Sequence, residues 1–331
     1  MEFEISTIDA HAEGMPVRLI TGEAPDIPGK TMAEKRDFVK QNLDYLRTFL
    51  ICEPRGHSGM LAAVLTPPVT DEAAFGLIFL SPLGYPGMCG HAVMGVATIA
   101  VETGIVELKE PTTEIVIDTP AGSIRTRINV EKGRARSVSV QNVPSFLYKR
   151  ELILKIPHVG EVPVDIAYGG NYFAIVEAKH LGITTHVDDI LRLQSLFEQI
   201  GNCVTQQVAV KDPEIGQINR ILISDKPTNP KANVKNIAVG TTNRLVDRSP
   251  CGTGTSARLA TQYFKGELGL GETFVTESMI GTLFYGKLIQ EVTIGSVRAV
   301  VPEVTGSAFI IGMHHFVMDK DDPLKYGIRI E

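Results

Sequence analysis

The sequence has no long apolar run, no excess of basic residues and no signal-like N-terminus. No segment approaches the roughly 18 consecutive apolar residues of a transmembrane helix, so no membrane span is expected. The formal net charge of −6 argues against a nucleic-acid partner. The first residues lack the basic and apolar regions of a signal peptide, and we therefore expect a cytoplasmic protein.

Cysteine is also scarce, because 331 residues contain only Cys52, Cys89, Cys203 and Cys251. There is no CxxC pair and no common zinc-site spacing, so we expect free thiols and no bound metal. With 44% hydrophobic and 21% charged residues, the composition is that of a globular protein. The length predicts about two domains, which can bury their cores without disulfides.

Two short segments, residues 88–95 and 250–257, resemble each other, and in both a cysteine is followed by glycine. Alignment of Cys89 with Cys251 also aligns Gly95 with Ala257 and Gly104 with Gly266. A second pair, residues 118–124 and 277–283, repeats a strand end and a glycine turn at nearly the same separation along the chain. We interpret this as an ancient duplication that gives an α+β fold with two pseudo-symmetric lobes, each a strand-rich shell around one buried helix.

Apolar spacing and turn residues predict four helices and several strands. The small apolar run after Cys89 has no proline and is followed by Gly104, which is typical of a buried helix with a C-terminal glycine. The predicted helices cover residues 32–50, 90–102, 187–200 and 252–265, and strands are expected at 4–10, 75–80 and 234–239.

Cys89 and Cys251 each lie where a turn enters a predicted helix. The first amides of a helix have no partner within it and carry the positive end of its dipole, which lowers a thiol pKa and binds anions. If the two lobes face each other, one thiol can remove a proton from a substrate while the other adds one to the opposite face. Cys52 and Cys203 are interpreted as inert packing.

Two polar residues near these cysteines allow two interpretations each. His91 is either a structural residue or a group that orients substrate beside the Cys89 thiol. Asp247 is either a turn aspartate or an acceptor for a substrate ammonium group. Their sequence context does not decide between these roles.

Two other motifs compete with this interpretation, and both are weak. Residues 252–257 match GxGxxA, with Glu272 twenty residues after Gly252, but a dinucleotide loop should follow a buried strand directly and here polar residues intervene. The Cys-x-His pair at Cys89 faintly suggests a zinc deaminase, but the HxE glutamate and the second CxxC cysteine are absent.

With the segments 88–91 and 247–257, the chain resembles the proline racemase family, which has the diaminopimelate-epimerase-like fold. Further family-like segments are residues 53–57, 142–146, 165–171 and 305–308. The resemblance therefore covers nearly the whole chain. It implies a first lobe of residues 1–128 plus about 309–331, a second lobe of residues 129–308, and an active site in the cleft between them.

The resemblance implies a cofactor-independent inversion of the α-carbon of proline or hydroxyproline. Cys89 and Cys251 would be the acid/base pair. Gly90, His91, Gly252 and Thr253 would bind the substrate carboxylate through their backbone amides, and His91 and Asp247 would lie near the ring nitrogen.

Cys251 also bears on the choice among activities, because dehydratases of the family usually replace this cysteine. Proline racemases tend to carry phenylalanine at two pocket positions, which correspond here to Leu61 and Thr241. The absence of phenylalanine at both positions favours a hydroxyproline 2-epimerase that converts trans-4-hydroxy-L-proline to cis-4-hydroxy-D-proline. Met15 also departs from the family, since many relatives have an acidic residue there.

Three alternatives stay open: a proline racemase with the same mechanism, a trans-3-hydroxy-L-proline dehydratase, and a non-catalytic imino-acid-binding protein. The expected partner is a small imino acid, with no nucleic acid and no membrane. A homodimer is expected by analogy with relatives.

Overall fold

The computed structural model describes residues 3–22, 25–208, 218, 220–240 and 245–329. The chain forms two compact units, which are described here one at a time. Unit 1 consists of Met1–Val140 and Gly306–Glu331, and unit 2 of Gln141–Thr305. None of the described helices is long and apolar enough to cross a membrane.

Hydrogen bonds near the two positions where the chain passes from one unit to the other fit a division at 140/141 and 305/306. Residue 128 lies inside a strand that pairs with the next strand from Thr126 to Glu131, so a boundary there would cut a hairpin. Where the chain returns from unit 2 to unit 1, Ser307 belongs to unit 1. Its amide donates a hydrogen bond to Glu13 Oε1 of that unit at 2.7 Å.

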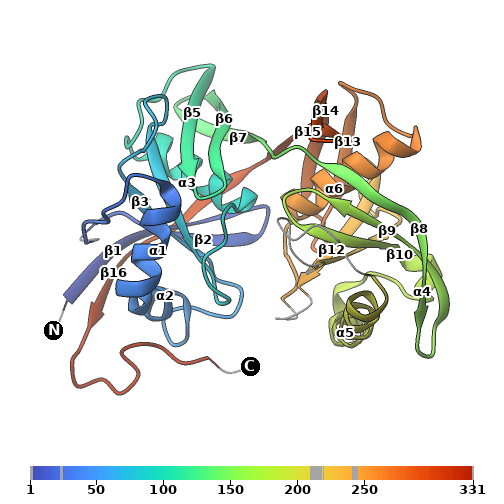
Figure 1. The fold of residues 1–331 in the computed structure, drawn as a ribbon. Coiled ribbons are helices and arrows are strands. Elements are labelled where there is room, and N and C mark those ends of the chain that lie inside the picture. The colour runs from blue at the N-terminus through green and yellow to red at the C-terminus, as the bar shows by residue number, and fades with distance from the viewer. Residues whose placement is uncertain (1–2, 23–24, 209–217, 219, 241–244, 330–331) are drawn as a thin grey trace. The chain divides into compact units, whose positions relative to one another are not determined.

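The strands of unit 1 are neighbours in the order β16-β1-β2-β3-β4-β5-β6-β7. Figure 1 shows the red C-terminal strand β16 beside the blue N-terminal strand β1, with which it pairs. β2 pairs parallel with β3 and β4 parallel with β5, and the other pairs of unit 1 are antiparallel. The bounds are β1 Phe3–Ala12, β2 Met15–Ile20, β3 Ala62–Thr66, β4 Phe75–Leu80, β5 Thr112–Thr119, β6 Gly122–Glu131, β7 Arg134–Gln141 and β16 Ala308–Met318.

The strands of unit 2 repeat this pattern in the order β8-β9-β10-β11-β12-β13-β14-β15. Again the third and fourth strands pair parallel, as do the fifth and sixth, while the others pair antiparallel. The bounds are β8 Phe146–Ile156, β9 Gly160–Tyr168, β10 Tyr172–Glu177, β11 Arg220–Asp225, β12 Val234–Gly240, β13 Thr273–Glu277, β14 Leu283–Ile294 and β15 Val297–Gly306.

Each parallel pair needs a crossover, and helices supply it. The first crossover is α1 Met32–Asn42 and α2 Asp44–Ile51 in unit 1, and α4 Ala178–Leu181, η1 Val187–Asp189 and α5 Ile190–Gln207 in unit 2. The second crossover is α3 Gly90–Glu102 in unit 1 and α6 Gly252–Lys265 in unit 2.

The single helix predicted over residues 32–50 is two helices. The backbone of Leu43 leaves helical geometry, with φ −129° and ψ 19°, and serves as both the C-cap of α1 and the N-cap of α2. Apolar spacing alone did not show this break, because both helices bury apolar residues in the same cluster.

In the mixed α+β fold, the strands of each unit surround one buried helix. α3 packs against β1, β2, β3, β6 and β16, and α6 packs against β8, β9, β10, β12 and β14. Every residue of α3 from His91 to Val101 is buried, as expected for a helix that is apolar all round. The glycines expected to follow these helices do so with left-handed φ values of 78° at both Gly104 and Gly266.

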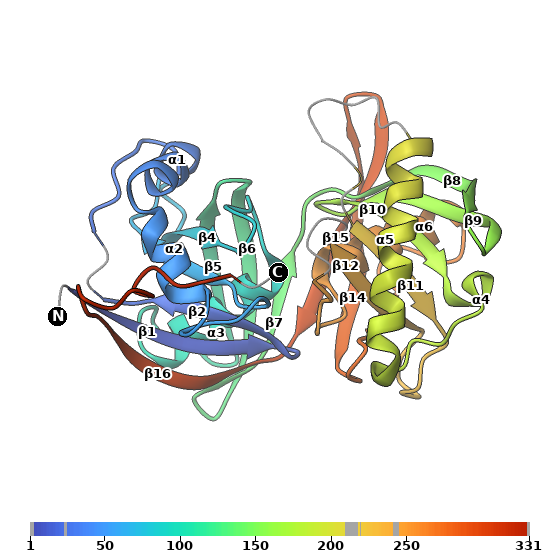
Figure 2. The same ribbon diagram turned by 90° about the horizontal axis from the view of Figure 1, so that it is seen from below.

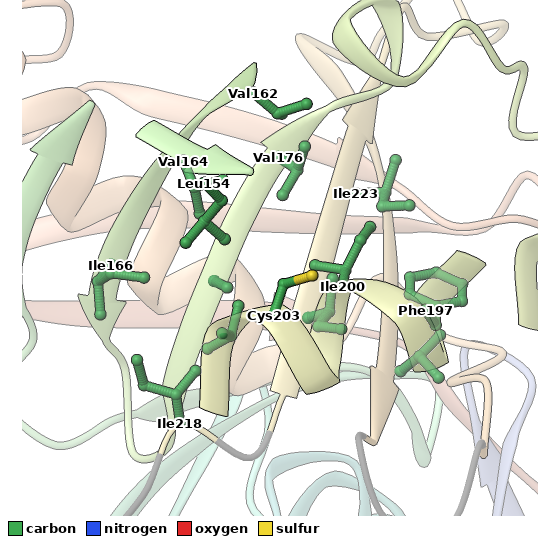
Figure 3. Close-up of a cluster of buried hydrophobic side chains, with 14 of the residues drawn as sticks. Leu154, Val162, Val164, Ile166, Val176, Phe197, Ile200, Cys203, Ile218 and Ile223 are labelled. Carbon is green, nitrogen blue, oxygen red and sulfur yellow. The ribbon is translucent and has the colours of Figure 1, made fainter. Parts of the chain in front are cut away.

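α5 packs against β8 and β11 of unit 2 (Figure 2). It is amphipathic and longer than the helix predicted over residues 187–200, because its apolar side continues to Cys203 and Val204. Phe197 and Ile200 pack there with residues of β8, β9, β10 and β11 (Figure 3). Cys203 is thus a buried core residue, as the sequence indicated.

A buried ion pair ties the sheet of unit 1 to the connection after α2. Arg18 donates from Nε and Nη2 to the carboxylate of Asp9, at 2.9 and 2.8 Å for the shortest contacts. Its Nη1 donates to the carbonyl oxygens of Leu50 and Arg55, and its guanidinium lies 4.3 Å from the ring centroid of Phe316. Arg18 and Asp9 are 4% and 5% exposed, so water cannot replace either partner.

We expect Arg18→Ala to lower the free energy of unfolding by about 3–5 kcal/mol, because it removes the three guanidinium contacts of the buried Asp9 carboxylate and leaves it the half-exposed His314, whose Nε2 lies 3.3 Å from Oδ2. The measurement is urea denaturation. Arg125→Ala is the matched control, since Arg125 pairs with Glu72 at the surface and its loss should cost only about 0–1 kcal/mol. Equal losses for the two variants would contradict the importance of the buried pair.

Candidate active site: two cysteine half-sites

Cys89 is the N-cap of the buried helix α3, with extended backbone angles of φ −148° and ψ 109°. Its Sγ lies 3.3 Å from Nδ1 and 3.7 Å from Nε2 of His91. Cys89 is partly exposed, whereas His91 is 9% exposed. The structure therefore brings Gly90 and His91 to the Cys89 thiol, and an imidazole lies where it can exchange a hydrogen bond with the sulfur.

Cys251 is the N-cap of α6 but has a different geometry. Its φ of +65° is in the left-handed range that a residue with a side chain rarely adopts. Its Sγ accepts a hydrogen bond from the Gly254 amide at 3.3 Å and lies 3.6 Å from Oγ1 of Thr253. Gly252 and Thr253, the other residues expected here, form the first turn of the same helix.

The pKa of the Cys251 thiol is raised, whereas the sequence predicted a lowered pKa. Burial raises its pKa, the negative charge of Asp247 raises it further, and the result is about 12. The hydrogen bonds from Thr253 and Gly254 and the charge of Arg220 lower the pKa, but they do not compensate for burial. At neutral pH the group is therefore a thiol, because desolvation of the thiolate outweighs the helix N-terminus.

Asp247 has the structural role that its sequence allowed. Its Oδ1 accepts hydrogen bonds from the amide and the hydroxyl of Ser249, at 2.9 and 2.8 Å. The Ser249 hydroxyl in turn accepts from the amide of Cys251 at 3.2 Å. This relay fixes the turn just before the strained backbone of Cys251. Among the described residues, every hydrogen bond to the Asp247 carboxylate is made to Oδ1.

Ser249 was missed by the sequence analysis, and so were two residues that support α6 from other segments. Asn142 Nδ2 donates to the Gly169 carbonyl at 3.0 Å and to the Ser256 hydroxyl at 2.8 Å. Gly169 is so close to α6 that an added Cβ would overlap the Thr253 carbonyl oxygen. Asn142 and Gly169 lie in family-like segments, which was the available signal, but only the fold shows what they contact.

The two expected specificity positions have different outcomes. Leu61 is 6% exposed and directly precedes β3, where its carbonyl accepts the Arg18 amide at 2.8 Å. Thr241 lies outside the described residues. The structure thus places Leu61 in unit 1 and leaves its contact with a substrate as a prediction.

Sequence comparison assigns this arrangement to a family, because residues 7–329 match the proline racemase family. The chain belongs to that family. A proline racemase of Acetoanaerobium sticklandii is 44% identical over 98% of each chain. A 4-hydroxyproline 2-epimerase of Streptosporangium roseum is 41% identical over 98% of this chain and 97% of its own. A trans-3-hydroxy-L-proline dehydratase of Bacillus cereus is 40% identical over 98% of each chain.

Solved structures agree with this assignment. A hydroxyproline epimerase from Agrobacterium vitis, with bound trans-4-hydroxy-L-proline, matches with a TM-score of 0.89 and 31% identity. The match covers 99% of this chain and 95% of that one. Relatives named racemase and epimerase are isomerases, and this chain is assigned to that enzyme class.

We expect alkylation of Cys251 by iodoacetamide to rise about tenfold per pH unit from pH 7 to 10, because the thiolate fraction is small throughout that range. Peptide mass spectrometry after timed quenching measures the rate. A plateau near pH 9, as for an ordinary thiol, would contradict the raised pKa.

Asp247→Asn is the matched variant for this titration. It retains the Oδ1 acceptor for Ser249 but removes the charge that raises the pKa of Cys251. Its Cys251 should therefore react faster than the wild type at every pH below the plateau.

Proposed function

We propose that this chain is a cofactor-independent epimerase that converts trans-4-hydroxy-L-proline to cis-4-hydroxy-D-proline. The observation that supports it most is the repeated placement of a cysteine. Cys89 and Cys251 are each the N-cap of the helix that connects the fifth and sixth strands of their unit. A duplicated fold with one thiol per copy supplies the two groups that inversion needs, one for each face of the α-carbon.

The two thiols begin the reaction in different states. Cys251 is protonated at neutral pH, because burial raises its pKa, and it is therefore ready to donate. The mechanism then requires that Cys89, which lies beside the imidazole of His91, removes the α-proton. After the transfer Cys89 is protonated and Cys251 is the thiolate, which is the form suited to the reverse reaction.

The helix N-termini supply the electrostatic stabilisation. An α-proton beside a carboxylate is very weakly acidic, so negative charge that develops on the carboxylate must be stabilised in the transition state. Backbone amides of Gly90, His91, Gly252 and Thr253 at the starts of α3 and α6 would bind that carboxylate. The ring ammonium would lie near His91 and Asp247, whose Oδ2 is not used by the Ser249 turn.

The substrate proposal depends on the pocket residues. A leucine at position 61 and a threonine at position 241 leave more room than two phenylalanines, and a threonine hydroxyl can bond the hydroxyl of the ring. Proline is the second candidate substrate, because the curated proline racemase of A. sticklandii is 44% identical to this chain. Both substrates use the same two-thiol chemistry.

Cys89→Ser and Cys251→Ser should each lower the rate of epimerisation by about 10²–10⁴-fold, because each removes one positioned acid/base group. Polarimetry and NMR detection of solvent deuterium at the α-carbon measure the effect. Cys203→Ala is the matched control, since Cys203 is buried within the α5 core and its loss should leave the rate unchanged. Activity retained by either serine variant would contradict the two-thiol mechanism.

For the substrate, wild-type enzyme should change the optical rotation of trans-4-hydroxy-L-proline faster than that of L-proline. Leu61→Phe should reduce that preference, because an aromatic ring fills the space proposed for the hydroxylated substrate. Comparison of kcat/KM for the two substrates gives the measurement. A wild-type preference for L-proline would retain the mechanism and reject the pocket argument, while keto-acid formation from trans-3-hydroxy-L-proline would indicate dehydration.

A further inference from the structure

Each unit contains a buried carboxylate that the proposed chemistry does not use. Asp118 lies near the end of β5 and Glu277 at the end of β13, and each is 1% exposed. They occupy equivalent positions in the two copies, because each begins one of the repeated segments 118–124 and 277–283. A carboxylate so deeply buried requires partners, and the partners are also repeated.

Asp118 binds the connection between β3 and β4. Its Oδ2 accepts the amides of Val69 and Thr70, both at 2.8 Å. Its Oδ1 accepts the hydroxyls of Thr70 and Ser123, at 2.9 and 2.7 Å. One side chain thereby joins a loop almost fifty residues earlier in the chain to the turn that follows β5.

Glu277 binds the corresponding connection between β11 and β12. Its Oε2 accepts the amides of Thr228 and Asn229, at 2.7 and 2.9 Å, and its Oε1 accepts the Thr228 hydroxyl. Val69 and Thr228 are equivalent, as are Thr70 and Asn229, because the strands on both sides of the two loops, β3 with β11 and β4 with β12, end and begin at residues with the same separation along the chain. The carboxylate and both amides that it binds are therefore equivalent in the two units, although the acid is longer by one methylene in unit 2.

Both groups are ionised. Burial raises the pKa of Asp118, but the hydrogen bonds from Ser123, Val69 and Thr70 outweigh it and hold the pKa below its ordinary value. Burial likewise raises the pKa of Glu277, and the bonds from Asn229 and Thr228 with the charge of Lys235 lower it overall. Fixed negative charges make these hydrogen bonds stronger than neutral ones.

In unit 1 the clamped turn contacts the segment that leads to the catalytic cysteine. The Ala121 amide, three residues after Asp118, donates to the Gly87 carbonyl at 3.1 Å, two residues before Cys89. Asp118 is therefore connected to the segment before Cys89 by one short turn and one backbone hydrogen bond.

In unit 2 the path uses hydroxyl groups. Thr276, the residue before Glu277, bonds Thr255 through their Oγ1 atoms at 3.0 Å. The Thr255 hydroxyl also lies 3.4 Å from the Pro250 carbonyl, directly before Cys251. Thr255 and Thr276 are fully buried, so this contact cannot exchange with water.

We propose that Asp118 and Glu277 are equivalent positioning residues, each of which fixes the segment that carries the catalytic cysteine of its own unit. The catalytic consequence rests on the proposed function, whereas the effect on the thiols does not. The proposal requires that loss of one carboxylate disturbs one cysteine and leaves the other unchanged.

The experiment measures alkylation of each cysteine separately, by peptide mass spectrometry, in the full-length chain. Asp118→Ala should change the rate at Cys89 about threefold or more and leave Cys251 at its wild-type rate, and Glu277→Ala should do the reverse. A displacement of about 1 Å can cost about 10²-fold in rate, so kcat on the active substrate should fall about tenfold or more while KM changes little. Equal changes at both cysteines, or loss of thermal stability with both rates unchanged, would overturn the proposal.

A milder pair of variants keeps the test valid if the alanine variants fail to fold. Thr276→Val is nearly isosteric and removes the hydroxyl that bonds Thr255 at 3.0 Å and the Phe284 carbonyl at 3.4 Å, so it should change the rate at Cys251 alone. Thr261→Val is its matched control, because Thr261 is equally buried and its hydroxyl donates to the Ala257 carbonyl within α6. Identical Cys251 rates in these two variants would reject the path in unit 2.

The two readouts separate this proposal from the proposed function. Suppose that no imino acid is epimerised but that each carboxylate variant changes the alkylation rate of the cysteine in its own unit alone. The carboxylates then position the thiols, and the assigned reaction is wrong. If epimerisation depends on both cysteines but the alkylation pattern is not selective in this way, the reaction stands and the positioning role fails.

Discussion

The close packing of one helix inside the sheet of each unit is the constraint on which the other features depend. In unit 1 a Cβ on Gly95 would overlap Cγ1 of Val17, so α3 reaches β2 only because residue 95 has no side chain. In unit 2 the same role falls to Gly169, which allows the β9–β10 turn to touch the first turn of α6. The helix N-termini, and the cysteines that cap them, are held in place by this contact.

The same packing makes the two half-sites chemically unequal. Cys89 has relaxed backbone angles, partial exposure and an imidazole beside its sulfur. Cys251 is 7% exposed and has a left-handed φ, and the Asp247–Ser249 relay holds its amide. The two units share one strand pattern but differ around their cysteine sulfur atoms, so that Cys89 is partly open to solvent while burial keeps Cys251 protonated.

Repetition extends beyond the cysteines to the supports behind them. The buried carboxylates at the ends of β5 and β13 bind equivalent loop amides, but they reach the cysteine segments through different groups, a backbone amide in unit 1 and two threonine hydroxyls in unit 2. The anchor is therefore common to both units, and the connection from anchor to thiol is particular to each.

The sequence by itself determined the features that depend on local pattern. The buried helices after Cys89 and Cys251, their terminal glycines and the repeat were predictable, because small apolar runs and glycine turns act on neighbouring residues. Only the tertiary structure decided the break at Leu43, the raised pKa of Cys251 and the partners of Asp118 and Glu277. Burial and hydrogen bonding between segments far apart in the chain create these properties, and periodicity carries no information about such contacts.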